Sequence, residues 1–212
     1  MNTSAPTIAI ADYGIGNLGS LVNALEYAGA KVVVSDAGQD LLDADGMILP
    51  GNGAFGAAKA AMDQRSILRW VGQRVAGGRP VLGICVGYQI LFERSEEFGN
   101  HEGMGEWPGT VQKLPTVSVP HIGWSRVKPV EDSTLFAGLD DAHFYFSHSY
   151  AVLDWGFDQQ NEAMVPPQVT WAQHDGDFIA AIENGPLSGV QFHPELSGSA
   201  GLTLLKNWLG TL

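Results

Sequence analysis

The sequence predicts a three-layer α/β/α fold built on a central, mostly parallel sheet with antiparallel strands added to it. Over the first hundred residues, short apolar runs alternate with segments of helical periodicity, which indicates parallel strands joined by crossover helices. From about Gly105, short alternating segments and turn signals such as Asp175-Gly176 indicate antiparallel strands. With 45% hydrophobic and 16% charged residues, the chain has enough apolar material for a sizeable core.

The first half of the chain supplies the parallel strands. They are expected at four apolar runs of buried-strand length, namely residues 7–11, 31–35, 46–49 and 80–84. A helix is expected after the first run, capped by Asn17 and ended by Gly29. Its apolar positions follow the i, i+3, i+4, i+7 spacing at Leu18, Leu21, Val22 and Leu25.

Three further helices are expected. One carries Ile67, Leu68, Val71 and Val75 and stops at Gly77-Gly78. Another should run from Cys85 to about Arg94, and the last carries Leu202, Leu205 and Leu209. Antiparallel strands are expected at residues 110–113, 144–151 and 178–183. No repeat or linker interrupts the pattern, so we expect a mobile arm over residues 1–6 and one domain over residues 7–212.

The charge and cysteine content narrow the function classes. The formal net charge is −12, from 11 basic and 23 acidic side chains, and no basic cluster suited to nucleic acid is present. The first basic residue is Lys31, which argues against a secretory signal, and no apolar stretch has membrane-span length. One cysteine excludes an intramolecular disulfide and favours a cytoplasmic location. No cofactor and no metal are expected.

The lone cysteine lies in a nucleophile-elbow pattern, Gly83-Ile-Cys85-Val-Gly87, where a buried strand meets a helix. The tight turn requires the two glycines and projects the sulfur at the carboxyl end of the sheet. The helix amino terminus behind the sulfur favours the thiolate. The alternative is a small buried hydrophobic residue, and the elbow alone does not separate amidase, peptidase and redox-sensor roles.

A second segment, Gly189-Val-Gln-Phe-His193-Pro-Glu195, supplies a base and a group to orient it. A thiolate nucleophile needs a proton shuttle, and that imidazole needs a third group to fix its tautomer. Residues two apart on an extended segment point the same way, so His193 and Glu195 are expected to face Cys85 together. Alone, the pair is more often solvated; together with the elbow it indicates a catalytic triad.

Gly-Ile-Cys-Val-Gly-Tyr-Gln at residues 83–89 and Gln-Phe-His-Pro-Glu at residues 191–195 resemble the signature of triad-type, class I glutamine amidotransferases. The resemblance implies a flavodoxin-like amidotransferase domain and a glutamyl thioester on Cys85. It also implies glutamine contacts from Gln89, from Glu97 toward the substrate amino group, and from the Ser149-Tyr150 backbone toward its carboxylate.

Leu49-Pro-Gly-Asn-Gly-Ala-Phe55 matches the oxyanion segment of that family. Glycines there let the backbone turn an N–H toward the developing oxyanion. The resemblance places the oxyanion hole at Gly51, Asn52 and Gly53 together with Val86, which follows the nucleophile. Asn52 stands where the family usually has Val, and its tolerance of left-handed backbone is expected to ease the turning of that peptide.

Three segments narrow the resemblance to glutaminase subunits of imidazole glycerol phosphate synthases, at residues 12–17, 119–124 and 145–150. Such a subunit docks on a separate (β/α)₈ cyclase subunit, which uses the ammonia in histidine biosynthesis, and the pair forms a heterodimer. The resemblance implies that Asn17 and Trp124 lie at or near the docking face. A plain helix cap and a core tryptophan are the alternatives. His121 and His148 are either structural or near the site.

Leu196 stands where this subfamily usually has Lys, which leaves the polar contact to the cyclase and the acceptor open. The alternatives are a related glutaminase subunit feeding another acceptor, as in sugar amination, or a non-catalytic interaction subunit. A stand-alone amidase or peptidase is disfavoured by the docking-type motifs.

Overall fold

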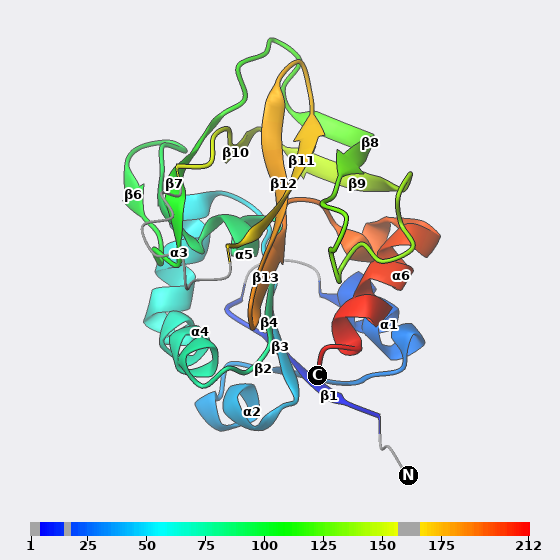
Figure 1. Cartoon of the computed structure of the whole chain (residues 1–212). Helices are drawn as coiled ribbons and strands as arrows, with labels where there is room; N and C mark the ends of the chain where they lie inside the picture. Colours follow the sequence, from blue (N-terminus) through cyan, green and yellow to red (C-terminus); the bar gives the residue numbers. More distant parts are fainter. Residues whose placement is uncertain (1–4, 15–17, 157–165) are drawn as a thin grey trace.

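The computed structural model describes residues 5–14, 18–156 and 166–212, and its central feature is a nine-stranded sheet (Figure 1). Across the sheet lie β2 (Lys31–Ser35), β1 (Thr7–Ala11), β3 (Gly46–Leu49), β4 (Val81–Ile84), β13 (Leu187–Val190), β12 (Asp177–Asn184), β11 (Gln168–Gln173), β8 (His121–Lys128) and β9 (His143–His148). Neighbours are parallel from β2 to β13 and antiparallel from β13 to β9. The predicted mixed sheet is confirmed.

Helices cover both faces of the parallel half. α1 (Gly19–Ala28) packs against α6 (Gly198–Leu209) on one face, and α3 (Phe55–Gln64) packs against α4 (Ile67–Ala76) on the other (Figure 1). The short α2 (Gly38–Asp43) also contacts α4. Because both faces are covered, every residue of β3, β4 and β13 is buried. β4 and β13 are parallel neighbours, so Cys85 and Gln191, which follow them, lie at the same edge of the sheet.

The helix predicted after the first strand is confirmed, and its end has the expected geometry. Gly29 adopts left-handed φ 106° at the C-cap of α1, where its N–H returns to the carbonyl of Glu26. The proposed N-cap residue Asn17 and residues 1–4 of the expected arm lie outside the described residues. The division into an arm over residues 1–6 and a domain over residues 7–212 stays a prediction.

The prediction of one long helix from Cys85 to about Arg94 is wrong. α5 spans only Val86–Gln89, and β5 (Phe92–Ser95) follows it. The carbonyl of Ile90 accepts the N–H of Met104, and that of Leu91 accepts the N–H of Glu106. These carbonyls bond to a distant segment instead of the next helical turn, so tertiary pairing ends the helix.

The antiparallel strands predicted as one addition to the sheet divide between two sheets. A four-stranded sheet in the described chain has the order β10 (Tyr150–Val152), β7 (Trp107–Lys113), β5 and β6 (His101–Glu102). The predicted strand at residues 144–151 breaks at Ser149, with β9 in the large sheet and β10 in the small one. Ser149 and Tyr150 consequently lie where the two sheets meet.

Arg74 is a fully buried cation that holds the loop between α2 and β3. Its guanidinium donates to five carbonyls at 2.8–3.3 Å, those of Leu41, Leu42, Ala44, Asp45 and Pro80. Burial, and secondarily the neighbouring Arg79, lower its pKa to about 10, so it stays charged at neutral pH. These bonds hold the segment before β3 against the start of β4.

We expect Arg74→Met to lower the free energy of unfolding by about 3 kcal/mol or more, because buried carbonyls lose their donors. Arg74→Lys should recover only part of this loss, since a compact ammonium cannot reach five acceptors in a plane. Denaturant unfolding measures both. Arg69→Met on the exposed side of the same helix is the matched control and should change stability little. Equal losses for the two Met variants would contradict the role of Arg74.

Candidate active site

Cys85 lies between β4 and α5 with φ 53° and ψ −115°, a strained conformation for a residue with a side chain. A Cβ at Gly87 would lie 2.0 Å from the carbonyl oxygen of Leu49, and one at Gly83 would lie 2.9 Å from Cα of Tyr88. Both flanking positions therefore require glycine, and the predicted elbow is confirmed. Strained backbone of this kind is commonly found at functional sites.

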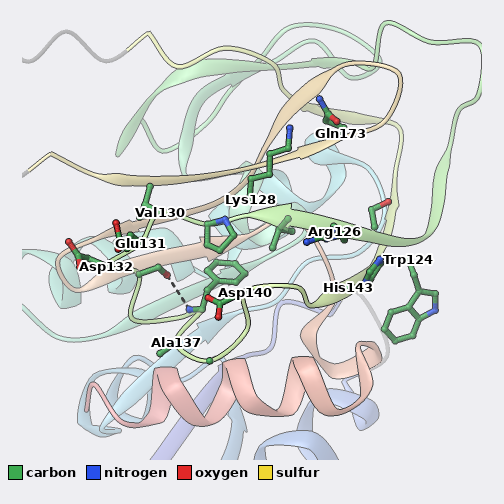
Figure 2. A pocket seen from close by; sticks show the side chains of 16 residues that line it. Trp124, Arg126, Lys128, Val130, Glu131, Asp132, Ala137, Asp140, His143 and Gln173 are labelled. Atoms are coloured by element: carbon green, nitrogen blue, oxygen red, sulfur yellow. Dashed lines mark hydrogen bonds between the residues drawn. The ribbon is translucent and has the colours of Figure 1, made fainter.

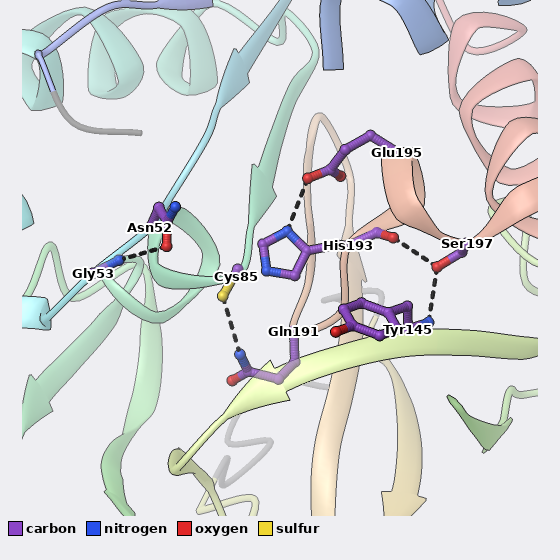
Figure 3. A network of polar contacts seen from close by, with 8 residues as sticks. All are labelled: Asn52, Gly53, Cys85, Tyr145, Gln191, His193, Glu195 and Ser197. Carbon is purple, nitrogen blue, oxygen red and sulfur yellow. Dashed lines mark hydrogen bonds and ion pairs between the residues drawn. The ribbon is translucent and has the colours of Figure 1, made fainter. Parts of the chain in front are cut away.

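The predicted base and its orienter are in direct contact. His193 Nδ1 lies 2.8 Å from Glu195 Oε1, and the imidazole stands between Glu195 and Cys85 (Figure 3). Because the carboxylate only accepts, Nδ1 carries the proton and Nε2 faces the sulfur. Burial lowers the pKa of His193, but contact with the Cys85 and Glu195 side chains outweighs it and raises that pKa. The raised pKa favours the protonated imidazolium form of His193 at neutral pH.

The pair meets by a route that the sequence argument did not foresee. His193 is extended, but Pro194–Leu196 forms a 3₁₀ turn rather than a continuing strand. Ser197 Oγ donates to the carbonyl of His193 at 2.6 Å and accepts the N–H of Tyr145 at 2.9 Å. The N–H of His193 also donates to the carbonyl of Tyr145. The turn is thereby anchored on β9.

The predicted oxyanion segment packs directly on the elbow. A Cβ at Gly51 would lie 2.0 Å from the amide nitrogen of Gly87. Left-handed backbone occurs at Gly53 (φ 81°) and not at Asn52, and the expectation that Asn52 eases the turning of this peptide stays a prediction. Asn52 instead accepts the N–H of Gly53 through Oδ1 at 2.9 Å. Its side chain therefore occupies an N–H that a Val side chain would leave free.

Tyr13 contacts this segment, and the sequence analysis did not identify it as a site residue. Its hydroxyl donates to the carbonyl of Pro50 at 2.6 Å, and the side chain is buried. Burial, followed by the electrostatic effect of the nearby Cys85, raises the pKa of Tyr13. The hydroxyl consequently stays protonated as a donor to the oxyanion segment.

A pocket of about 260 Å³ opens beside the sulfur. Its lining brings together most of the predicted site residues, from three separate parts of the chain: Asn52, Gly53, Cys85, Val86, Gln89, Glu97, Ser149 and Tyr150. Glu97 Oε2 accepts the N–H of Phe55 at 2.6 Å, which ties the glutamate to the start of α3. A larger cavity of about 1010 Å³ between Trp124 and Gln173 lacks Cys85 (Figure 2).

Of the residues implied at a docking face, two are in the described chain, and both are exposed. Trp124 is 54% exposed and Leu196 is 45% exposed, so the alternative of a core tryptophan is wrong. Ile122, two positions before Trp124 on β8, is 60% exposed and lines the mouth of the small pocket. The third residue, Asn17, lies outside the described residues.

His121 and His148, whose role the sequence left open, form a buried relay. His148 Nδ1 lies 3.0 Å from the carbonyl of Tyr150, which only accepts, so Nδ1 carries the proton. His148 Nε2 must then accept from His121 Nδ1 at 3.0 Å, and His121 Nε2 accepts from Ser125 Oγ at 2.9 Å. Both rings are neutral in this arrangement, which holds the Tyr150 backbone in place.

Because both buried rings are neutral, we expect the folded protein to lose stability in acid. Burial, followed by the stacked His174, lowers the pKa of His121 to about 4, and burial lowers that of His148 to about 3. In the unfolded chain the pKa of each histidine is about 6.5. Below that pH the unfolded chain therefore binds more protons than the folded one. Stability is therefore lost as the pH falls from about 6.5 toward 4, by about 1.4 kcal/mol per pH unit for each histidine.

Denaturant unfolding at several pH values measures this slope. His148→Gln keeps a donor and an acceptor but does not titrate, so it should remove one histidine's share of the slope. His143→Gln, on the exposed end of β9, should keep the full slope. A slope unchanged in His148→Gln would assign the acid sensitivity to other groups.

The described residues contain no group of three or more His, Cys, Asp or Glu side chains placed to hold a metal ion. Over the same residues, no helix has the length and apolarity needed to cross a membrane.

Comparisons with known proteins agree with this geometry. The family model described as glutamine amidotransferase class-I matches residues 9–211. The "Imidazole glycerol phosphate synthase subunit HisH" of Renibacterium salmoninarum is 55% identical over 207 residues, covering 97% of this chain and 94% of the relative. The protein of the same name from Streptomyces avermitilis is 52% identical over 212 residues, with 99% of each chain covered.

Solved structures support the fold. One described as "Crystal structure of glutamine amidotransferase" superposes with TM-score 0.73 at 18% identity, covering 96% of this chain and 99% of that one. The glutaminase domain of Trypanosoma brucei CTPS with bound acivicin gives 0.64 at 17% identity, covering 98% and 94%. The chain therefore belongs to the class I glutamine amidotransferases. Within that class it belongs to the family of imidazole glycerol phosphate synthase HisH subunits.

Proposed function

We propose that this chain hydrolyses glutamine to glutamate and ammonia and delivers the ammonia to a (β/α)₈ cyclase subunit in histidine biosynthesis. The observation that carries the proposal is the contact of His193 with Glu195 beside Cys85, at the edge of a pocket lined by Gln89 and Glu97. A nucleophile, a proton shuttle and an orienting carboxylate next to a polar pocket suit amide hydrolysis.

In the proposed mechanism, the Cys85 thiolate attacks the side-chain carbonyl carbon of glutamine. The oxyanion that forms is stabilised by backbone N–H groups of Val86 and of the segment Gly51-Asn52-Gly53. His193 donates its Nε2 proton to the departing nitrogen, which leaves as ammonia, and a glutamyl thioester remains on Cys85. His193 then takes a proton from water, which attacks the thioester and releases glutamate.

Substrate binding is assigned to the opposite wall of the pocket. Glu97 offers a carboxylate to the substrate ammonium, and the Ser149 and Tyr150 backbone faces the substrate carboxylate. Gln89 is buried and donates through Nε2 to the Tyr150 carbonyl at 2.9 Å. This bond links the helix that follows Cys85 to the backbone that faces the substrate carboxylate. Three separate chain segments thereby define a slot for one amino acid with an amide side chain.

We place the cyclase on the face that carries Ile122, Trp124 and Leu196. All three are exposed apolar side chains, and Ile122 lines the pocket beside Cys85, from which ammonia would leave. Leu196 replaces the polar contact usual in the family with an apolar one, which fits a buried interface. The proposal includes a heterodimer and a cytoplasmic location, because a thiolate nucleophile needs a reducing compartment.

Eight relatives between 48% and 55% identical share the HisH subunit name, which favours the cyclase over another acceptor such as one in sugar amination. The assembled Cys85, His193 and Glu195 argue against a non-catalytic interaction subunit. Mixing the chain with the cyclase, its nucleotide substrate and glutamine tests the assignment through formation of imidazole glycerol phosphate. Glutamine hydrolysis without that product would favour another acceptor.

We expect the isolated chain to be a poor glutaminase that the cyclase activates. In the free chain, the N–H of Gly53 is held by Asn52 Oδ1 rather than presented to substrate. Release of glutamate should rise at least about tenfold when the cyclase and its substrate are added, a coupling in the usual range for linked sites. Full glutamate release by the chain alone would contradict both the coupling and the docking assignment.

A further inference from the structure

Gln191 is a buried polar side chain next to the nucleophile that the triad does not use. It precedes His193 by two positions, follows the last strand of the parallel half, and is 0% exposed. A buried carboxamide has two donors and one acceptor to satisfy, so its partners reveal its orientation. Two partners are present, Gln89 and the sulfur of Cys85.

The orientation of this carboxamide follows from a backbone carbonyl. The carbonyl of Tyr150 only accepts, so the Gln89 atom 2.9 Å from it is the amide nitrogen Nε2. The same nitrogen lies 2.9 Å from Gln191, whose contacting atom must therefore be the acceptor Oε1. The carbonyl is itself held by the Nδ1–H of His148. Neither amide can flip without losing a buried hydrogen bond.

With Oε1 committed to Gln89, the Nε2 of Gln191 is left facing Cys85. It lies 3.9 Å from the sulfur, and Figure 3 places the amide on the side of Cys85 away from Asn52. A donor at this distance makes a long contact with a neutral thiol. Catalytic hydrogen bonds are often long before substrate binds and shorten when the acceptor gains charge.

We propose that Gln191 donates its amide N–H to Cys85 Sγ and is a further catalytic residue, stabilising the thiolate alongside His193. Hydrogen bonds from Gln89 to the Tyr150 carbonyl and to Gln191 hold the donor in this orientation. Gln89, which lines the pocket, therefore also fixes the amide that faces the sulfur. This inference rests on the proposed role of Cys85 as nucleophile. It adds to the sulfur a second hydrogen-bond donor besides the imidazole.

The test is the pH dependence of alkylation of the one cysteine in the chain by iodoacetamide, followed by intact mass. Thiolate reacts and thiol does not, so the midpoint of the rate profile reports thiolate formation. Gln191→Met keeps the length of the side chain without a donor. It should move the midpoint upward by about one pH unit, a tenfold change typical of a hydrogen bond to a charged group.

Gln173→Met, at an exposed position on β11, is the matched control and should keep the wild-type midpoint. A folded Gln191→Met chain with an unchanged midpoint overturns the inference. If thermal unfolding shows that Gln191→Met is not folded, Gln191→Glu tests the inference instead. This substitution is isosteric and replaces a donor with an acceptor. It should raise the midpoint further, and an unchanged midpoint there also overturns the inference.

The outcome is separable from that of the proposed function. Stoichiometric alkylation of wild-type Cys85 that leaves glutaminase activity intact would refute the nucleophile assignment itself. Loss of activity on alkylation together with identical midpoints in all variants would refute only the role of Gln191.

Discussion

Cys85→Ala is expected to abolish glutamine-dependent synthesis by the complex with its cyclase, by about four orders of magnitude or more, and to leave ammonia-dependent synthesis intact. The reason is that the proposed thioester requires the sulfur of Cys85, whereas free ammonia would bypass the whole glutaminase site. Alanine keeps the backbone position and removes one atom from a 5% exposed side chain. Product formation with glutamine and with ammonium salt, measured side by side, gives both rates.

Ammonia-dependent synthesis serves as the internal control, since it needs a folded, docked subunit and an intact cyclase. Equal loss of both activities would mean that Cys85 holds the elbow together rather than attacking substrate. Persistence of glutamine-dependent synthesis in Cys85→Ala would remove the nucleophile assignment altogether.

His193→Ala should cost about a hundredfold more in glutaminase rate than Glu195→Gln. In the proposed mechanism, His193 moves the protons of both half-reactions, while Glu195 orients the ring and stabilises its positive charge through the 2.8 Å contact with Nδ1. Glutamine at residue 195 keeps an acceptor for that Nδ1–H but removes the charge that stabilises the imidazolium. Single-turnover measurements at saturating glutamine, with the cyclase present, separate this chemical cost from weaker binding.

Equal inactivity of the two variants would count against a role for Glu195 that acts only through His193. Ser197→Ala offers a useful comparison, because it removes the hydroxyl that binds the His193 carbonyl without touching the ring. A rate for Ser197→Ala between wild type and Glu195→Gln would rank backbone anchoring below charge stabilisation.

The parallel half of the fold was predictable because its signals are local. Buried apolar runs, helical spacing and Gly29 in left-handed backbone each encode an element without help from distant residues. The elbow was predictable because Gly83, Cys85 and Gly87 form one short pattern. Only the steric demand at Gly83 is local, since it comes from Tyr88, whereas that at Gly87 comes from Leu49. The helices α2 and α3 were not predicted, because α2 is short and α3 is rich in alanine and weakly patterned.

The second sheet and part of the site depend on pairings that no local pattern contains. Phe92 leaves the helical path because β5 pairs with β7, whose residues come more than ten positions later. Gln191 reads as one more residue of a buried strand until the fold brings Gln89 beside it. Tyr13 is likewise a plausible core tyrosine until its hydroxyl meets the Pro50 carbonyl.

The interlocked glycines of the two loops have a mechanical consequence. A single added carbon at Gly51 would lie 2.0 Å from the Gly87 nitrogen, and one at Gly87 would lie 2.0 Å from the Leu49 oxygen. The two main chains touch with nothing compressible between them, so they travel as one body. A docked partner that displaces the segment around Gly51 would therefore also displace the elbow that carries Cys85, and the distance between the two would be preserved.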